Sequence, residues 1–184
     1  LFDENSESIE NRFNVELDGI EYDAKFVFEE IGYNLEGSEI GASFGLVQLE
    51  KLQENIKIRQ ENFIRQTKFF SKYNQFFTVP AENSKCKTAW LAYPILIKND
   101  APFSRKEFQI FLEKNNIQTR VVFTGNILRQ PMCRNIQKIV SKNGYQNSDN
   151  IMRRGVLLPV HHGMTEDMFE KFFYIIELFI EKNK

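Results

Sequence analysis

The chain of 184 residues is long enough to bury a sizeable core, and its 42% hydrophobic content, with 18 Phe, indicates a packed globular protein. Twenty-four Lys and Arg against 25 Asp and Glu leave a net charge of -1, so electrostatics gives no reason to propose nucleic acid or an anionic membrane surface as a partner. No apolar run approaches the ~20 residues of a membrane span, and Cys86 and Cys133 lack metal-ligand spacing, so we expect a cytoplasmic protein with free thiols and no metal site.

The first 30 residues do not resemble the start of a self-standing domain, so we expect the chain to begin inside a larger protein. Their polar first part is followed by an Asp18-Gly19 turn between two short strand-like pieces. From Ser38 to about Tyr73, apolar residues recur at three- and four-residue steps and predict a long helix. A helix of ~35 residues would be ~50 Å long, so we expect a bend or break near Glu54–Asn55.

The second half of the chain alternates strands and helices. The apolar run Trp90–Ile97 predicts a strand, whose Pro94 favours an edge or bulge position. Ser104 caps a short amphipathic helix, and Thr165 begins a helix that continues almost to the C-terminus. Further strands are predicted at Gln118–Phe123 and Gly155–Val160, and turns at Asn143-Gly144 and Asn147–Asn150. This order favours an α/β (α+β) domain in which helices pack on a small sheet.

The histidine pair His161-His162 is a candidate for a functional site, since it follows a predicted strand directly. Adjacent residues on an extended chain point to opposite sides, so the two are not expected to bind one metal ion. Either one lines a cleft, or both have an ordinary loop role. The common signatures of phosphate loops, dinucleotide sites, metalloproteases and serine hydrolases do not occur in the sequence.

The loop Thr124-Gly125-Asn126 has an Arg on either side, Arg120 before it and Arg129 after it. Loops at strand ends often carry function, and the guanidinium fork binds phosphates and carboxylates through two hydrogen bonds. The cluster therefore fits a sugar-phosphate or nucleotide ligand. The alternative is that one of these Arg side chains pairs with a structural carboxylate.

Small residues gather at the start of the long helix, which follows a Gly32-Tyr33-Asn34 turn. Small side chains let another helix, a second subunit or a ligand phosphate approach the backbone. Asn34 serves either the geometry of the turn or an anion held nearby.

Several segments together carry a family resemblance: IGYNLEGSEIGASFGLVQLEKL, APFSRKEF, NNIQTR, FTGNILRQP and LLPVHHGMTEDMFEKF. Over about residues 10 to 180, in the same order, the chain resembles the C-terminal part of the DegT-type nucleotide-sugar aminotransferase and dehydratase family. The Thr-Gly-Asn and Arg-Gln-Pro motifs resemble most closely the sugar 3-dehydratase branch, whose members act on 4-keto-6-deoxyhexoses attached to a nucleotide.

The resemblance implies the small C-terminal domain of the aspartate-aminotransferase fold, with a small, mostly antiparallel sheet packed with helices. It implies that residues 1–36 are the tail of a large domain and a linker, and that residues 37–184 are the small domain. It further implies a homodimer that uses pyridoxal 5'-phosphate or pyridoxamine 5'-phosphate in the biosynthesis of deoxysugars and lipopolysaccharide.

The resemblance also assigns roles to individual residues. Asn34 matches an Asn that reaches the cofactor phosphate of the neighbouring subunit. The nucleotide-sugar ligand is expected to contact Arg120, Asn126 and Arg129, with His161 or His162 as further substrate-binding candidates.

Three departures from the family pattern qualify these assignments. Glu36 stands where the family usually has Lys or Arg, so the phosphate contact would rest on Asn34 alone. The stretch before Arg12-Phe13 has no Cys, which argues against the iron–sulphur cluster of some CDP-sugar dehydratases. No residue matches the cofactor-binding Asp or the catalytic Lys or His, so we expect no catalytic residue in this chain and no activity from it alone.

The preferred hypothesis is a 3-dehydratase, in which a His outside this chain acts as the base and the 3-hydroxyl leaves as water. A sugar aminotransferase of the same family, with Lys in place of that His, is the alternative. A non-catalytic dimerisation or interaction domain is a third possibility, because small residues at a helix start suit close helix packing equally well.

Overall fold

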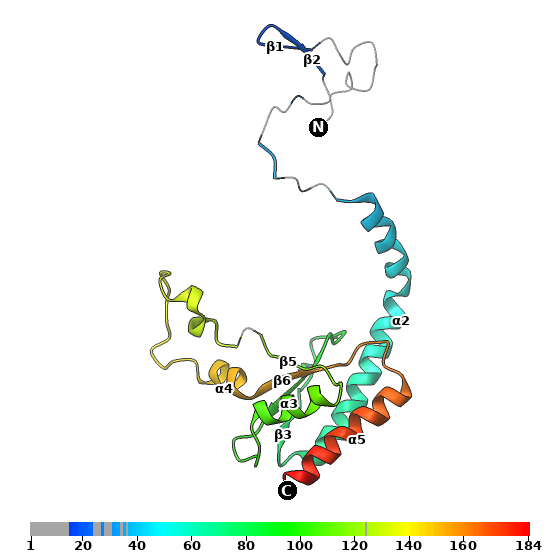
Figure 1. The fold of residues 1–184 in the computed structure, drawn as a ribbon, viewed down its shortest axis with the longest axis vertical. Coiled ribbons are helices and arrows are strands. Elements are labelled where there is room, and N and C mark those ends of the chain that lie inside the picture. Colours follow the sequence, from blue (N-terminus) through cyan, green and yellow to red (C-terminus); the bar gives the residue numbers. More distant parts are fainter. Residues whose placement is uncertain (1–14, 24–26, 28–30, 34, 36, 124) are drawn as a thin grey trace. The chain divides into compact units, whose positions relative to one another are not determined.

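The computed structural model describes residues 15–23, 27, 31–33, 35, 37–123 and 125–184 (Figure 1). The chain divides into two compact units, residues 1–46 and 47–184. Helix α2 spans the boundary between these units. The predicted domain boundary between residues 36 and 37 stays a prediction.

The first unit contains a two-stranded antiparallel hairpin of β1 (Val15–Leu17) and β2 (Ile20–Tyr22). Asp18 and Gly19 join the strands with φ angles of 50° and 82°. A two-residue hairpin loop of this kind needs positive φ at both positions, which Asp and Gly tolerate better than most residues. The predicted turn is confirmed.

Helix α2 (Glu39–Phe70) is followed by a 3-10 turn, η3 (Ser71–Tyr73). The helix runs without interruption through residues 54 and 55, so the predicted break is absent, and the alternative of a bend there stays a prediction. The prediction assumed that the whole helix must fit inside a compact domain. Its buried residues all lie between Asn62 and Phe70, whereas residues 39–54 are exposed. Only the last part of the helix must therefore match the size of the core.

The second unit contains a four-stranded antiparallel sheet in the order β3-β4-β6-β5. The strands are β3 (Phe77–Thr78), β4 (Tyr93–Ile97), β5 (Arg120–Val121) and β6 (Gly155–Leu158). The predicted small antiparallel sheet is confirmed, although β5 is shorter than the predicted strand Gln118–Phe123.

Pro94 lies in an inner strand, so its predicted edge position is wrong. Strand β4 pairs with β6 along most of its length, but β3 pairs only with Leu96 and Ile97. No strand of the described sheet therefore pairs with β4 at Pro94 on the side of β3. A missing backbone N–H is tolerated where one side of a strand needs no ladder hydrogen bond.

Helix α4 (Gln146–Arg154) occupies the region where turns were predicted at residues 147–150. That prediction is wrong. Asn, Ser and Asp favour turns because their side chains bond to nearby backbone groups. Here the Asp149 side chain is buried and bonds to residues 126 and 129 instead, so tertiary contacts override the local preference.

The two remaining helices begin at the caps that the sequence predicts. In α3 (Arg105–Lys114), Ser104 and Glu107 form a reciprocal capping box. In α5 (Glu166–Lys182), the Thr165 hydroxyl accepts a hydrogen bond from the N–H of Met168. Two short 3-10 turns, η4 (Ile127–Arg129) and η5 (Pro131–Cys133), lie between β5 and α4.

Aromatic side chains from α2, the sheet, α3 and α5 make one core. Phe70 of α2 is fully buried and contacts Phe77 of β3, Tyr93 of β4 and Phe172 of α5 at ring-centroid distances of 5.3, 5.5 and 6.4 Å. Phe108 of α3 joins the same cluster through Phe77. The helices therefore pack against one small antiparallel sheet, which confirms the predicted fold class. Within the described part of the chain, no helix combines the length and the apolar character of a membrane span.

We predict that Phe70→Ala lowers the free energy of unfolding by about 3–5 kcal/mol, because it removes a large buried ring from a packed cluster. Urea unfolding followed by circular dichroism measures the effect. Tyr174→Ala, on the exposed side of α5, is the control and should change stability by less than about 0.5 kcal/mol. Equal losses in the two variants would contradict this account of the core.

Candidate ligand pocket and the loop after β5

The predicted site residues divide between the two ends of β5. Strands β5 and β6 are antiparallel, with Arg120 opposite Leu157. The start of β5 therefore lies beside the end of β6, where His161 follows. The end of β5 lies beside the junction of α4 and β6, and the loop with Asn126 and Arg129 begins there.

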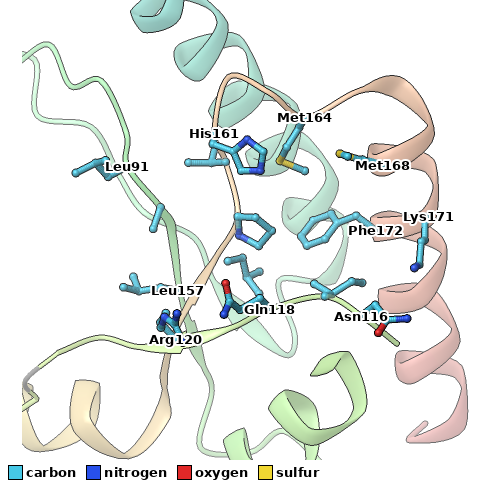
Figure 2. Close-up of a pocket in the computed structure, with 15 residues that line it drawn as sticks. Leu91, Asn116, Gln118, Arg120, Leu157, His161, Met164, Met168, Lys171 and Phe172 are labelled. Carbon is cyan, nitrogen blue, oxygen red and sulfur yellow. The ribbon is translucent and has the colours of Figure 1, made fainter. Parts of the chain in front are cut away.

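A pocket with a volume of about 520 Å³ opens at the first of these ends. Figure 2 shows Gln118 just before β5 and Arg120 at its start, His161 and Met164 in the loop before α5, and Lys171 on α5. The volume is within the range of small-molecule sites in proteins. The walls are mostly apolar, with side chains that include Leu91, Leu157, Met164, Met168 and Phe172.

The polar groups of this pocket are mainly hydrogen-bond donors. Arg120 and Lys171 line it, and none of the described lining residues is Asp or Glu. Neither cation has a side-chain hydrogen bond or an ion pair with any residue that the structure describes. An apolar hollow with unpaired cations and no carboxylate suits an anion that also has an apolar part.

His161 adds a further donor to the pocket. Its Nδ1 accepts a hydrogen bond of 3.2 Å from the N–H of Gly163, so the neutral ring carries its proton on Nε2. Partial burial, then Arg59 and His162, lower the pKa of His161 below its usual value of 6.5. The imidazole is therefore neutral at pH 7. His162 does not line the pocket.

Two amides of α2 fix the wall of the pocket. Asn62 donates from Nδ2 to the carbonyl of His161 at 3.0 Å, and Gln66 donates from Nε2 to the carbonyl of Pro159 at 2.7 Å. Gln66 is fully buried, and Asn62 is 8% exposed. Because the two donors lie one helical turn apart, they match two carbonyls that lie two residues apart on an extended segment. We call this pair of hydrogen bonds the amide clamp.

At the other end of β5, the carboxylate of Asp149 holds both predicted loop residues. Its Oδ1 accepts from Asn126 Nδ2 at 2.8 Å and from Arg129 Nε at 2.5 Å, while its Oδ2 accepts from Arg129 Nη2 at 2.5 Å. The hydrogen bonds from Arg129, and then from Asn126, hold the pKa of Asp149 well below its usual range. The alternative reading of Arg129, a pairing with a carboxylate, is therefore observed.

The backbone of this loop also needs Gly125. Its φ is +67°, and a Cβ there would lie 2.6 Å from Cγ of Met152 on α4. The side chain of Asn126 accepts a hydrogen bond from the N–H of Leu128 and so caps η4. The loop is thus packed against α4 and bonded to it.

The predicted ligand contacts all stay predictions, and the structure adds three residues that the sequence reasoning missed. Asn34 lies outside the described residues. Lys171 appears in the sequence only as a polar position in an apolar helix, and nothing local distinguishes it. Asp149 lies in a segment that the sequence predicts as a turn. Gln66 follows the regular pattern of the long helix, so no local signal identifies either residue as part of a site.

The sequence model of the DegT/DnrJ/EryC1/StrS aminotransferase family matches residues 1–177. The chain therefore belongs to this family. The lipopolysaccharide biosynthesis protein RfbH of Salmonella typhimurium is 30% identical over 161 residues, which are 87% of this chain and 36% of that protein. The dTDP-4-dehydro-2,6-dideoxy-D-glucose 3-dehydratase of Saccharopolyspora spinosa is 31% identical, over 87% of this chain and 34% of that enzyme. The chain thus spans about a third of the length of these relatives.

Relatives in this family include transaminases as well as dehydratases. The dTDP-4-amino-4,6-dideoxy-D-glucose transaminase of Escherichia coli is 28% identical over 76% of this chain and 37% of that enzyme. Among solved structures, GDP-4-keto-6-deoxy-D-mannose-3-dehydratase of E. coli with bound hydrated PLP has a TM-score of 0.67 and 25% identity, covering 84% of this chain and 38% of that one. The fold is therefore that of the PLP-dependent aminotransferases.

PLP sites often place an Asp against the pyridine nitrogen and a Lys at the reactive carbon. The described lining of the pocket has Arg120 and Lys171 but no acidic residue, so it offers no carboxylate to a pyridine nitrogen. Asn34 lies outside the described residues. No group of three or more His, Cys, Asp or Glu suited to a metal ion occurs in the described ranges either.

We predict that Gln66→Leu lowers the free energy of unfolding by about 1–3 kcal/mol, because the carbonyl of Pro159 loses the hydrogen bond from the fully buried Gln66 side chain. Chemical denaturation measures the loss. Exposed Gln53 on the same helix supplies the control, Gln53→Leu, which should be nearly neutral. A Gln66→Leu variant as stable as the control would show that the amide clamp does not stabilise the fold.

We predict that the stabilising effect of Asp149 depends on pH. Its pKa is lower in the folded chain, so its hydrogen bonds contribute fully above the ordinary Asp pKa of about 3.9 and are lost as the pH falls further. The difference in melting temperature between the parent and Asp149→Asn should be largest near neutral pH and should shrink below about pH 4. Asp100→Asn, at an exposed turn, serves as the control. A difference that is constant from pH 7 to pH 3 would contradict the prediction.

Proposed function

We propose that the chain belongs to a PLP- or PMP-dependent nucleotide-sugar 3-dehydratase, which removes the 3-hydroxyl of a 4-keto-6-deoxyhexose in deoxysugar or lipopolysaccharide biosynthesis. Family membership and the name of one 31% identical relative, a 3-dehydratase, support the class of reaction. The name of a 30% identical relative, a lipopolysaccharide biosynthesis protein, supports the biosynthetic context. The observation that carries the proposal for this chain is the pocket with unpaired Arg120 and Lys171 and no carboxylate.

In this proposal the pocket binds one end of the sugar nucleotide. The guanidinium of Arg120 and the ammonium of Lys171 donate to phosphoryl oxygens, which accept charge-assisted hydrogen bonds. His161 donates from Nε2, because Nδ1 is already bonded to Gly163. The apolar wall with Leu157 and Met168 suits the 6-methyl group of a 6-deoxysugar and excludes water from it.

The cofactor, when bound, supplies the electron sink for elimination of the hydroxyl. The residues of this chain bind and orient the sugar nucleotide. Asn34 is proposed to contact the cofactor phosphate of the neighbouring subunit in a homodimer, and the catalytic base is proposed to lie outside this chain. A cytoplasmic location is part of the same proposal.

A sugar aminotransferase is the second candidate, because transaminases are among the relatives. The pocket suits both, since both act on nucleotide sugars according to the names of their members. The two candidates differ in the product, which is a deoxygenated keto sugar for the dehydratase and an amino sugar for the aminotransferase.

We predict that Arg120→Ala and Lys171→Ala in the full-length protein each raise the KM for the nucleotide sugar about tenfold, since each removes a charged hydrogen bond to the ligand. Steady-state kinetics measure KM, and mass spectrometry of the sugar distinguishes loss of water from gain of an amine. Lys68→Ala, on the exposed side of α2, should leave KM unchanged. Unchanged KM in both pocket variants would contradict the assignment of the pocket.

A further inference from the structure

Asp149 uses both of its carboxylate oxygens within the loop after β5. Its Oδ1 accepts from Asn126 and from Arg129 Nε, and its Oδ2 accepts from Arg129 Nη2. The carboxylate is almost buried, with its side chain 11% exposed. One acidic group thus holds the two loop residues that the sequence marks as ligand contacts.

These contacts involve only one edge of the Arg129 guanidinium. The group is planar and has five N–H donors in a fixed arrangement, so the Nε and Nη2 edge faces Asp149 while the Nη1 donors point away from it. No hydrogen bond from Nη1 to a described residue is present, and the side chain of Arg129 is 54% exposed. The second edge is therefore oriented and open to solvent.

Packing and hydrogen bonds within the loop support this arrangement. Gly125 lies against Met152, and Asn126 caps η4, in which Arg129 is the last residue. The helix α4 that carries Asp149 also has Arg153 one turn later, exposed to solvent. The positive charges of Arg129 and Arg153 outnumber the single negative charge of Asp149. This local excess of positive charge favours an anion at the exposed edge of Arg129.

We propose that Asp149 is a positioning residue, which holds Arg129 so that the free edge of its guanidinium binds a phosphoryl group of the substrate. This inference rests on the proposed function. Phosphoryl oxygens accept charge-assisted hydrogen bonds from a guanidinium, so the diphosphate of a nucleotide sugar offers the exposed edge of Arg129 a matching acceptor. A fixed guanidinium loses less side-chain entropy on binding than a free one, which is the gain that Asp149 provides.

Calorimetric titration of the full-length protein with GDP and with dTDP tests the proposal. We expect Arg129→Ala and Asp149→Asn each to weaken nucleotide binding about tenfold. The double variant should bind no more weakly than Arg129→Ala alone, because Asp149 acts through Arg129. Asn147→Ala, an exposed position on the same helix, is the control and should bind like the parent. Thermal unfolding of every variant shows whether it is folded at the temperature of the titration.

The outcomes separate this inference from the proposed function. Tight binding of a nucleotide by folded Asp149→Asn overturns the positioning role and leaves the proposed function intact. Additive losses in the double variant also overturn it, because they show an effect of Asp149 that does not pass through Arg129. If neither nucleotide binds to the parent protein, both the proposed function and this inference fail.

Discussion

The packing of α2 against the sheet is the constraint on which the candidate pocket depends. The last turns of this helix contribute Phe70 to the aromatic core, and the same turns donate two buried amides to the segment after β6. A buried amide without an acceptor is costly, so the positions of Pro159 and His161 are tied to the position of the helix. The pocket wall is therefore part of the core of the domain, not an independent loop.

Charge distribution distinguishes the two ends of β5. At the first end, Arg120 and Lys171 have no acidic partner among the described residues, so they are available to a ligand. At the second end, Arg129 is paired with Asp149, yet one edge of its guanidinium remains exposed. An unpaired cation attracts an anionic ligand through its charge. A cation held by a carboxylate presents its remaining N–H donors to a ligand in a fixed direction.

Local features were predicted well because they depend on neighbouring residues alone. The Asp18-Gly19 turn and the cap at Ser104 follow from the φ angles and hydrogen bonds that these residue types favour. Features that depend on the surroundings were predicted less well. The turn expected at residues 147–150 is helix α4, because Asp149 finds its partners in the preceding loop. The strand with Pro94 lies inside the sheet, and the proline is tolerated there because the neighbouring strand β3 is too short to reach it.

The sequence by itself determined helices α2, α3 and α5, the caps of α3 and α5, the small antiparallel sheet, and the family to which the chain belongs. It did not determine α4. It also indicated Arg120 and Arg129 as candidates for anion binding. Only the tertiary structure decided that these two residues lie in different settings, one in a pocket with Lys171 and the other bonded to Asp149. The reason is that these contacts join residues far apart in the chain, such as Gln66 and Pro159, which are 93 positions apart. Their approach depends on the order of the strands and on the packing of helices, which local sequence patterns do not encode.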